Sequence, residues 1–312
     1  MTAIGAHPGS RRALRQTFWI TVAALTLYVG ARSLPVGRGD LHYTDFAAGA
    51  SGGLELCAPG GPQFVPVDRV ASPVTMKVRA EGEAPLRIGS AATLHLVLTT
   101  ASGKPVTEDD LLVVHTQKFH LLAVDPALRD YQHLHPVATA RPGEYAVEFT
   151  PAGAGEYRFF ADFTPRSTGR ALYAGARVAV AGADALEHGK AAAIDETRTS
   201  VVEGYRFDLG LTPAVLRINE MAELSLDVRS PDGSPARLEE IMGAHAHVVA
   251  FDLGRTGFAH LHPLATRGAA QDSKAALRFE LNLPDPGTYR LWAQVKIDGR
   301  ELFAPFTLQA RP

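Results

Sequence analysis

Short runs of apolar, β-branched and aromatic residues follow one another along most of the chain from about residue 70 onward, separated by turns that contain Gly and Pro. Each half of this region has about seven such runs, at intervals of roughly 8 to 15 residues. This pattern is typical of an antiparallel β-sandwich of about a hundred residues. We therefore predict an all-β protein built from two tandem sandwich domains.

The two halves of this region align with each other. Leu86-Arg-Ile88 corresponds to Leu216-Arg-Ile218, and Gly155-Glu-Tyr157 corresponds to Gly287-Thr-Tyr289. The shift between matched residues stays between 127 and 132 positions, so insertions are confined to loops. A repeat of this length indicates a duplicated domain, because the units of solenoid proteins are about 20 to 50 residues long.

Composition divides the chain into five predicted segments. Residues 33–70 form an irregular lead-in, rich in Gly, Pro and Ala, and residues 182–200 form a linker rich in Ala and charged residues. The first sandwich covers residues 71–181 and the second covers residues 201–312. Residues 1–32 form a signal peptide or an N-terminal membrane anchor.

The N-terminal segment has the pattern of an export signal. Arg11, Arg12 and Arg15 precede a charge-free, largely apolar run at residues 18–31, which ends in the small-residue sequence Val29-Gly30-Ala31. A run of this length is shorter than the roughly 20 residues that span a bilayer. We expect the protein to be exported to the periplasm or the cell surface. Cleavage of this segment and its retention as an anchor in the cytoplasmic membrane are both open alternatives.

One histidine-rich pattern occurs once in each repeat. The two copies are His120–Asp125 with His133–Pro136, and His247–Asp252 with His260–Pro263, and all matched residues are 127 positions apart. In each copy an apolar run leads through a short polar segment into a second extended run. This order predicts a β-hairpin, with the aspartates as turn residues.

The spacing of each hairpin predicts which histidines meet. Folding about the midpoint sets His120 opposite His135, and His247 opposite His262, with Cβ atoms about 4.5 to 5.5 Å apart. Side chains alternate along a strand, so His133 shares a face with His135, and His260 shares a face with His262. We therefore expect at least three imidazoles on one face of each hairpin.

Imidazole clusters of this kind can hold copper, zinc or another transition metal. A blue-copper centre is not expected, because the clusters contain no cysteine. We predict a nitrogen-only site in the first domain and a softer site, better suited to copper, in the second, where the Met242 thioether favours Cu(I). The expected ligands are His115, His120, His133 and His135 in the first domain, and Met242, His245, His247, His260 and His262 in the second.

The motifs Phe119–Asp125 and Gln132–Pro136, followed by the Gly155-Glu-Tyr157 strand, resemble the YtkA-like domain of bacterial secreted and membrane-anchored proteins. The resemblance covers both repeats, about 230 residues. It implies two tandem immunoglobulin-like sandwiches, related in shape to FixH-type domains. It also implies an exported protein of a group often linked with metal and copper handling.

Charge and residue types exclude several function classes. The balance of 31 basic against 33 acidic residues forms no basic stripe, so nucleic acid is not an expected partner. The single cysteine, Cys57, lies far from the histidines in the sequence, and His188 falls in the charged linker, where solvation is expected. No combination of nucleophile and base appears, so we do not expect an enzyme.

A structural role for the histidines is the alternative to metal binding. Leu122, Val124 and Val249 share their face in the predicted hairpins, and buried histidines can be satisfied by hydrogen bonds alone. In that case the protein is a non-enzymatic immunoglobulin-like module. It then serves a structural role or binds a membrane or periplasmic protein partner.

Overall fold

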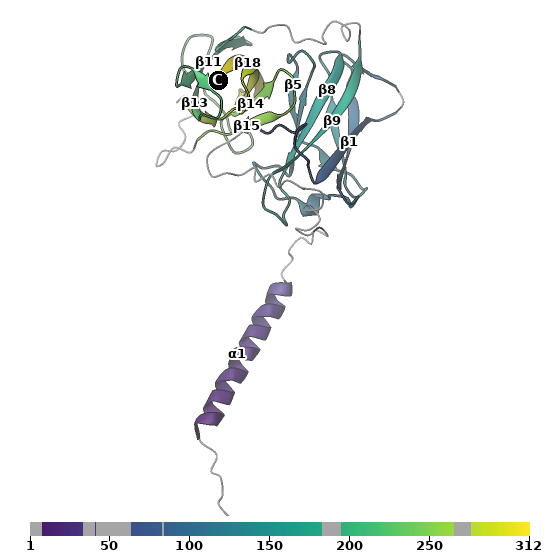
Figure 1. Cartoon of the computed structure of the whole chain (residues 1–312), viewed down its shortest axis with the longest axis vertical. Helices are drawn as coiled ribbons and strands as arrows, with labels where there is room; N and C mark the ends of the chain where they lie inside the picture. Colours follow the sequence, from purple (N-terminus) through teal and green to yellow (C-terminus); the bar gives the residue numbers. More distant parts are fainter. Residues whose placement is uncertain (1–7, 34–40, 42–63, 83, 183–194, 265–275) are drawn as a thin grey trace, which may run out of the picture. The chain divides into compact units, whose positions relative to one another are not determined.

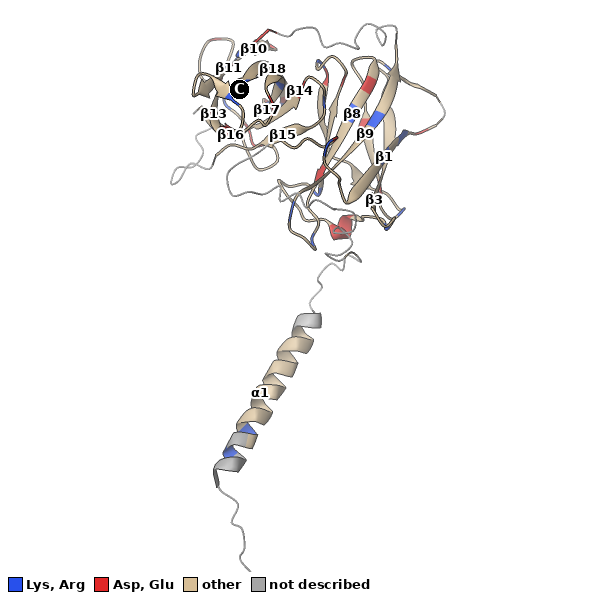
Figure 2. Ribbon diagram, viewed as in Figure 1, with Lys and Arg blue, Asp and Glu red and all other residues tan. Residues whose placement is uncertain are grey.

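The computed structural model describes residues 8–33, 41, 64–82, 84–182, 195–264 and 276–312. Cys57, His188 and most of the predicted lead-in and linker lie outside the described residues. The predicted N-terminal segment forms the helix α1, Pro8–Ser33, and Figure 2 shows its described basic residues only near its first turns. Among the described residues, no helix combines the length and the apolar character needed to cross a membrane.

The first repeat is a sandwich of two sheets (Figure 1). Four-stranded and five-stranded sheets pack together around a core in which Leu94, Leu96 and Leu98 are fully buried on alternate positions of one strand. The four-stranded sheet has the order β1 (Val74–Ala80), β3 (Ala92–Thr100), β7 (Glu144–Phe149), β6 (Val137–Ala138). The five-stranded sheet has the order β2 (Leu86–Arg87), β9 (Leu172–Ala181), β8 (Gly155–Phe163), β4 (Phe119–Val124), β5 (Tyr131–Leu134). A short 3₁₀ helix, Glu108–Asp110, precedes β4.

The second repeat has the same architecture, as the aligned sequence halves predict. One sheet has the order β10 (Thr199–Val202), β11 (Tyr205–Thr212), β13 (Ala222–Arg229), β16 (Leu277–Leu281). The other has the order β12 (Leu216–Arg217), β18 (Arg300–Arg311), β17 (Gly287–Ile297), β14 (His247–Asp252), β15 (Phe258–Leu261). The prediction of two tandem immunoglobulin-like sandwiches is confirmed. Each five-stranded sheet departs from a purely antiparallel pattern at one edge, where its two-residue strand pairs in parallel.

The two histidine hairpins form in the predicted register. Leu121 pairs with Leu134 in the first repeat, and Val248 pairs with Leu261 in the second, which places His120 level with His135 and His247 level with His262. At the hairpin ends, Asp125 Oδ1 accepts a hydrogen bond from the backbone of Arg129 at 2.6 Å, and Asp252 Oδ1 accepts one from Thr256 at 2.7 Å. The aspartates therefore close the turns, as predicted.

A third apolar cluster joins the two repeats. Every residue of β4 is buried, because its inward side chains fill the sandwich core while the outward ones, Leu122 and Val124, pack against the second repeat. Val249 and Phe251 of β14 meet them from the other side. The apolar residues on the histidine face thus pack between domains, with the outer faces of the five-stranded sheets turned toward each other.

The contacts across this interface are reciprocal. Phe160 of the first repeat packs on Phe258 of the second at a ring distance of 5.5 Å, and their counterparts Trp292 and Tyr131 lie 5.9 Å apart. Tyr173 likewise contacts Phe258 at 5.4 Å, as its counterpart Phe303 contacts Tyr131 at 5.8 Å. The two repeats are therefore related by an approximate two-fold axis.

The end of the predicted lead-in packs against both repeats. Val65 exchanges two backbone hydrogen bonds with Phe258, at 2.7 and 3.1 Å, and so extends the edge of β15. Asp68 contacts the first repeat, where its Oδ2 accepts a hydrogen bond from Arg158 Nη1 at 2.6 Å. Residues 64–68 therefore pack along the junction of the repeats, because their alternate apolar side chains complete its apolar cluster. Periodicity over so few residues was too short to reveal this.

We expect Gly257→Ala to loosen this junction. A Cβ at Gly257 would lie 1.9 Å from the Val65 carbonyl oxygen, so the 64–68 segment must move. The cost of such overpacking is about 1–3 kcal/mol in the free energy of unfolding, measurable by urea denaturation. Gly175→Ala is the matched control, since a Cβ there meets the side chain of Val67 at an ordinary 3.4 Å. Equal unfolding midpoints for the two variants would contradict the packing described here.

Candidate metal centre

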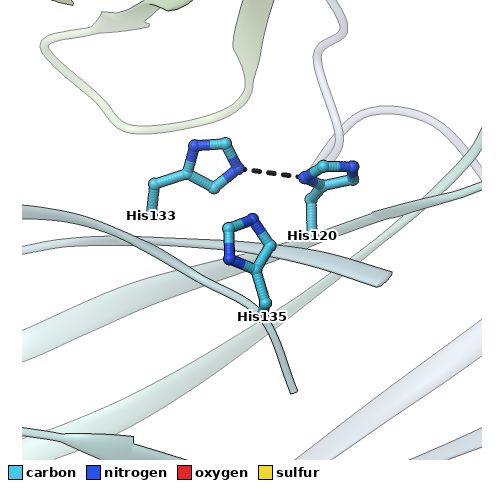
Figure 3. Close-up of side chains that lie close together, drawn as sticks. All are labelled: His120, His133 and His135. Carbon is cyan, nitrogen blue, oxygen red and sulfur yellow. Dashed lines mark hydrogen bonds between the residues drawn. The ribbon is translucent and has the colours of Figure 1, made fainter. Parts of the chain in front are cut away.

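Three histidines of the first repeat converge on one point (Figure 3). We call His120, His133 and His135 the first triad. One nitrogen atom of each ring lies within 4.8 Å of one nitrogen of each of the others. The ring centroids are 4.9 to 5.3 Å apart. The first triad thus has the close grouping that the hairpin spacing predicts.

Hydrogen bonding fixes the tautomer of His120. Its Nε2 lies 3.0 Å from the backbone oxygen of Val114, and a carbonyl oxygen can only accept a hydrogen bond. Nε2 therefore carries the proton of the neutral ring. The remaining nitrogen, Nδ1, has a lone pair directed toward the triad.

His133 is fixed in the opposite tautomer. Its Nδ1 lies 2.9 Å from Oε1 of Gln294, whose Nε2 donates to the Glu301 carboxylate at 2.8 Å. A carboxylate accepts only, so the glutamine amide keeps its oxygen toward His133. Nδ1 of His133 is therefore the donor and Nε2 has the lone pair. This Nε2 lies 3.1 Å from the unprotonated Nδ1 of His120 (Figure 3).

The second repeat has a similar arrangement of three histidines, with a carboxylate in place of the glutamine amide. Its second triad consists of His247, His260 and His262, again with one nitrogen of each within 4.8 Å of the others. His247 Nε2 donates to the Ile241 carbonyl at 3.0 Å, and His260 Nδ1 lies 3.1 Å from Oδ2 of Asp162. Within the described part of the chain, His247 Nδ1, His260 Nε2 and His262 Nε2 are buried without a hydrogen-bond partner.

The two partners that orient these rings come from the opposite repeats. Gln294 belongs to β17 and orients His133 of the first repeat, whereas Asp162 belongs to β8 and orients His260 of the second. Sequence reasoning missed both residues. They occupy matched positions, since Asp162 pairs with His120 and Gln294 pairs with His247 in their sheets. A polar residue beside a histidine on the neighbouring strand was the available signal.

The sequence groups His115 with the ligands of the first domain, and the structure places its ring against the second triad. His115 stacks on His262 of the second triad, with ring centroids 3.6 Å apart and planes at 16°. It also meets His247 edge-on at 6.1 Å. The reason is that the turn holding His115, in a left-handed backbone conformation at φ 49°, lies at the interface rather than on the hairpin. Met242 occupies the matching turn of the second repeat, at φ 52°.

His245 does not belong to either triad. It precedes β14, and its buried Nδ1 has no hydrogen-bond partner among the described residues. The sequence pattern places His245 among the expected ligands, but β14 begins only at His247, so His245 lies before the strand that positions the triad. Six of the nine expected ligands therefore form the triads. His115 lies against the second triad, while Met242 and His245 lie in or beside the preceding turn.

Burial keeps the triads uncharged. It lowers the pKa of every triad histidine, that of His247 to about 4 and those of His133 and His260 well below the ordinary value. Neighbouring histidines lower the pKa of His133 and His260 further. Burial raises the pKa of Asp162 to about 6, although His120 and His115 partly oppose this rise. The site thus presents neutral imidazoles, the form that binds metal ions.

Comparison with solved structures finds similar chains at low sequence identity and low TM-score. The Escherichia coli adhesin FdeC is 16% identical over 80% of this chain and 66% of its own, with a TM-score of 0.23. The Lin-41 filamin domain is 16% identical over 39% of this chain and 98% of its own, with a TM-score of 0.20. Fibronectin(III)-like modules of Clostridium thermocellum CbhA are 13% identical over 75% of this chain and 93% of theirs, with a TM-score of 0.19. At these TM-scores the likeness assigns no activity to this chain.

A family model matches the chain twice. The model described as "Domain of unknown function (DUF8832)" covers residues 71–182 and again residues 199–312. The two matches coincide with the two sandwiches and agree with the duplication seen in the sequence. No curated protein matches this chain.

We expect the metal-free protein to lose stability as the pH falls from about 6.5 to 4. The unfolded chain binds protons at histidines near pH 6.5, whereas folded His247 does so only near 4, so protons favour the unfolded state in this window. His247 alone contributes of the order of 3 kcal/mol to this loss. Asp162 acts in the opposite direction, because its carboxyl group, with a pKa raised to about 6, binds a proton more readily in the folded state than in the unfolded chain. Its effect is smaller, since it is a single group, whereas burial lowers the pKa of all six triad histidines. Chemical denaturation with chelator present measures the trend, and a free energy of unfolding that is constant over this window would contradict it.

Proposed function

This chain belongs, in two tandem copies, to the family described as a domain of unknown function (DUF8832), and from its own site we propose that it is an exported metal-binding protein. Each triad binds one transition-metal ion through three imidazole nitrogens. The ligands are His120 Nδ1, His133 Nε2 and His135 in the first triad, and His247 Nδ1, His260 Nε2 and His262 Nε2 in the second. Copper is the preferred ion, and zinc satisfies the same donors.

One observation supports this proposal above the others. His120 and His133 each donate their only N–H to an oxygen, so two lone pairs face each other at 3.1 Å. Without a proton or a cation between them, these nitrogens repel each other and both lose their hydrogen bonds to water. A metal ion turns the same two lone pairs into bonds. The tautomers that the surrounding oxygens impose are therefore those that metal binding requires.

The ligand chemistry narrows the choice of ion. Three neutral nitrogen donors suit copper and zinc, and they leave further coordination positions for water or another ligand. The triads contain no thiolate, so a blue-copper electron-transfer site is excluded from the proposal. The Met242 thioether lies in the turn equivalent to that of His115, which packs on the second triad. By the two-fold relation, this soft donor is associated with the first triad, the reverse of the assignment made from the sequence.

The remaining features agree with an exported protein that stores or transfers the ion. The apolar run within α1 follows basic residues, as in a signal or an anchor, and the resemblance of the histidine motifs to YtkA-like domains agrees with copper handling outside the cytoplasm. Within the triads, no carboxylate or thiol competes with the imidazoles as a ligand. We propose binding and buffering of the ion, without catalysis.

A structural module is the second candidate function. The apolar interface, with Leu122, Phe251 and Trp292 among its members, holds the repeats together by packing alone. In that case the histidines only complete the junction, and the protein presents two fixed sandwiches to a protein partner. This alternative leaves the facing lone pairs without a favourable interaction.

Removing one histidine from each triad in turn separates the two candidates. We expect the purified full chain to bind two Cu(II) ions, and the His135→Ala and His262→Ala variants to bind one each. Each substitution leaves one triad with two of its three imidazoles, and the loss of a third of its nitrogen donors prevents that triad from holding its ion. Equilibrium dialysis followed by metal analysis measures the stoichiometry. His95→Ala is the matched control, since His95 lies on β3 of the other sheet and bonds Glu144 at 3.1 Å. Unchanged stoichiometry in both triad variants would favour the structural module.

A further inference from the structure

We infer that the two triads form one dinuclear metal centre, assembled across the junction of the two repeats. The sequence predicts two independent sites, one in each domain, but the geometry joins them. This inference rests on the proposed function and adds that the two ions interact. It also assigns to each repeat residues that position the ligands of the other.

The histidines of the two triads lie close together. Rings within a triad have centroids 4.6 to 5.7 Å apart. Across the junction, His133 lies 5.2 Å from His260, His120 lies 5.8 Å from His260, and His133 lies 6.1 Å from His247. Histidines of different triads are therefore almost as close as histidines of the same triad, and the six rings form one continuous group.

These distances limit the separation of the ions. A metal bound at about 2 Å from an imidazole nitrogen lies about 3 Å from the ring centre. With 5.2 Å between the centres of His133 and His260, two ions bound by these rings are at most about 11 Å apart. Two paramagnetic ions at that distance interact measurably through space.

The hydrogen bonds that orient the ligands cross the junction between the repeats. Gln294 orients His133, and Asp162 orients His260, so neither triad has its full set of supporting hydrogen bonds within its own repeat. His115 of the first repeat also stacks on His262 of the second. A separated repeat would lack these supports, and the complete centre therefore requires the docked arrangement that the interdomain apolar cluster holds in place.

The charge of the bound ions also links the two triads. Two divalent ions bound by six neutral imidazoles place four positive charges beside the buried apolar cluster of the junction. Asp162 is the carboxylate that contacts a triad, through His260, among the described residues. Asp162 lies between His120 of its own repeat and His260 of the other, so its negative charge is close to both ions and partly offsets their positive charge. The Asp162 carboxylate is a positioning residue in this scheme, because it acts through His260.

Electron paramagnetic resonance of the Cu(II)-loaded full chain tests the inference. We expect one Cu(II) per chain in His133→Ala/His135→Ala and in His260→Ala/His262→Ala, each with the spectrum of an isolated ion. The unmodified chain with two Cu(II) should show dipolar broadening and a half-field transition that neither variant shows. Two bound ions whose spectrum equals the sum of the two single-triad spectra would overturn the dinuclear centre while leaving metal binding intact. Failure to bind two ions would instead contradict the proposed function.

The contribution of Asp162 of the first repeat to metal binding by the second triad can be tested separately. In the His133→Ala/His135→Ala background, which retains only the second triad, Asp162→Leu should weaken Cu(II) binding about 10- to 100-fold, as losses of ligand-orienting hydrogen bonds do. Asp162→Asn keeps an acceptor oxygen for His260 Nδ1 and should restore most of the affinity. Competition against a chromophoric copper chelator measures both. Equal affinity for the Leu and Asn variants would show that the first repeat does not support the second triad.

Discussion

Burial of the outer faces of the two five-stranded sheets against each other is the interaction on which the rest of the molecule depends. A sandwich domain ordinarily exposes the outer face of each sheet, and its strands alternate apolar and polar residues. Here Leu122 and Val124 on β4, and Val249 and Phe251 on β14, are apolar on the outward side as well. This second apolar layer removes water from the histidines that lie on the same strands.

Removal of water determines the chemistry of the triads. In water, a histidine nitrogen that lacks a protein partner bonds to the solvent, and a pair of facing lone pairs would be separated by it. At the junction, His120 and His247 donate to backbone carbonyls, while His133 and His260 donate to Gln294 and Asp162. The remaining nitrogens point inward with lone pairs. In these four rings the proton is donated to an oxygen at the periphery, and the basic nitrogen lies toward the centre.

The sequence carries the local structure of this site but not its assembly. The period-two alternation and the turn aspartates determine the hairpin register, so the meeting of His120 with His135 and of His247 with His262 follows from spacing alone. The docking of the two repeats depends on side chains far apart in the sequence, and no local period encodes it. For this reason the sequence does not reveal that His115 stacks on His262, or that Asp162 and Gln294 orient histidines of the opposite repeat. Leu122, Val124 and Val249 carried the missing information, because apolar residues beside the histidines had to pack against something outside their own sandwich.

The approximate two-fold axis resembles that of a symmetric dimer, but here the two subunits are fused in one chain. In a homodimer every residue near the axis appears twice, so the two halves of a shared site must be chemically identical. Fusion removes that restriction, and the matched residues Asp162 and Gln294 differ although each orients a histidine of the opposite half. Covalent linkage therefore allows two geometrically equivalent positions to have unequal charge, a distinction that two copies of one gene product cannot make.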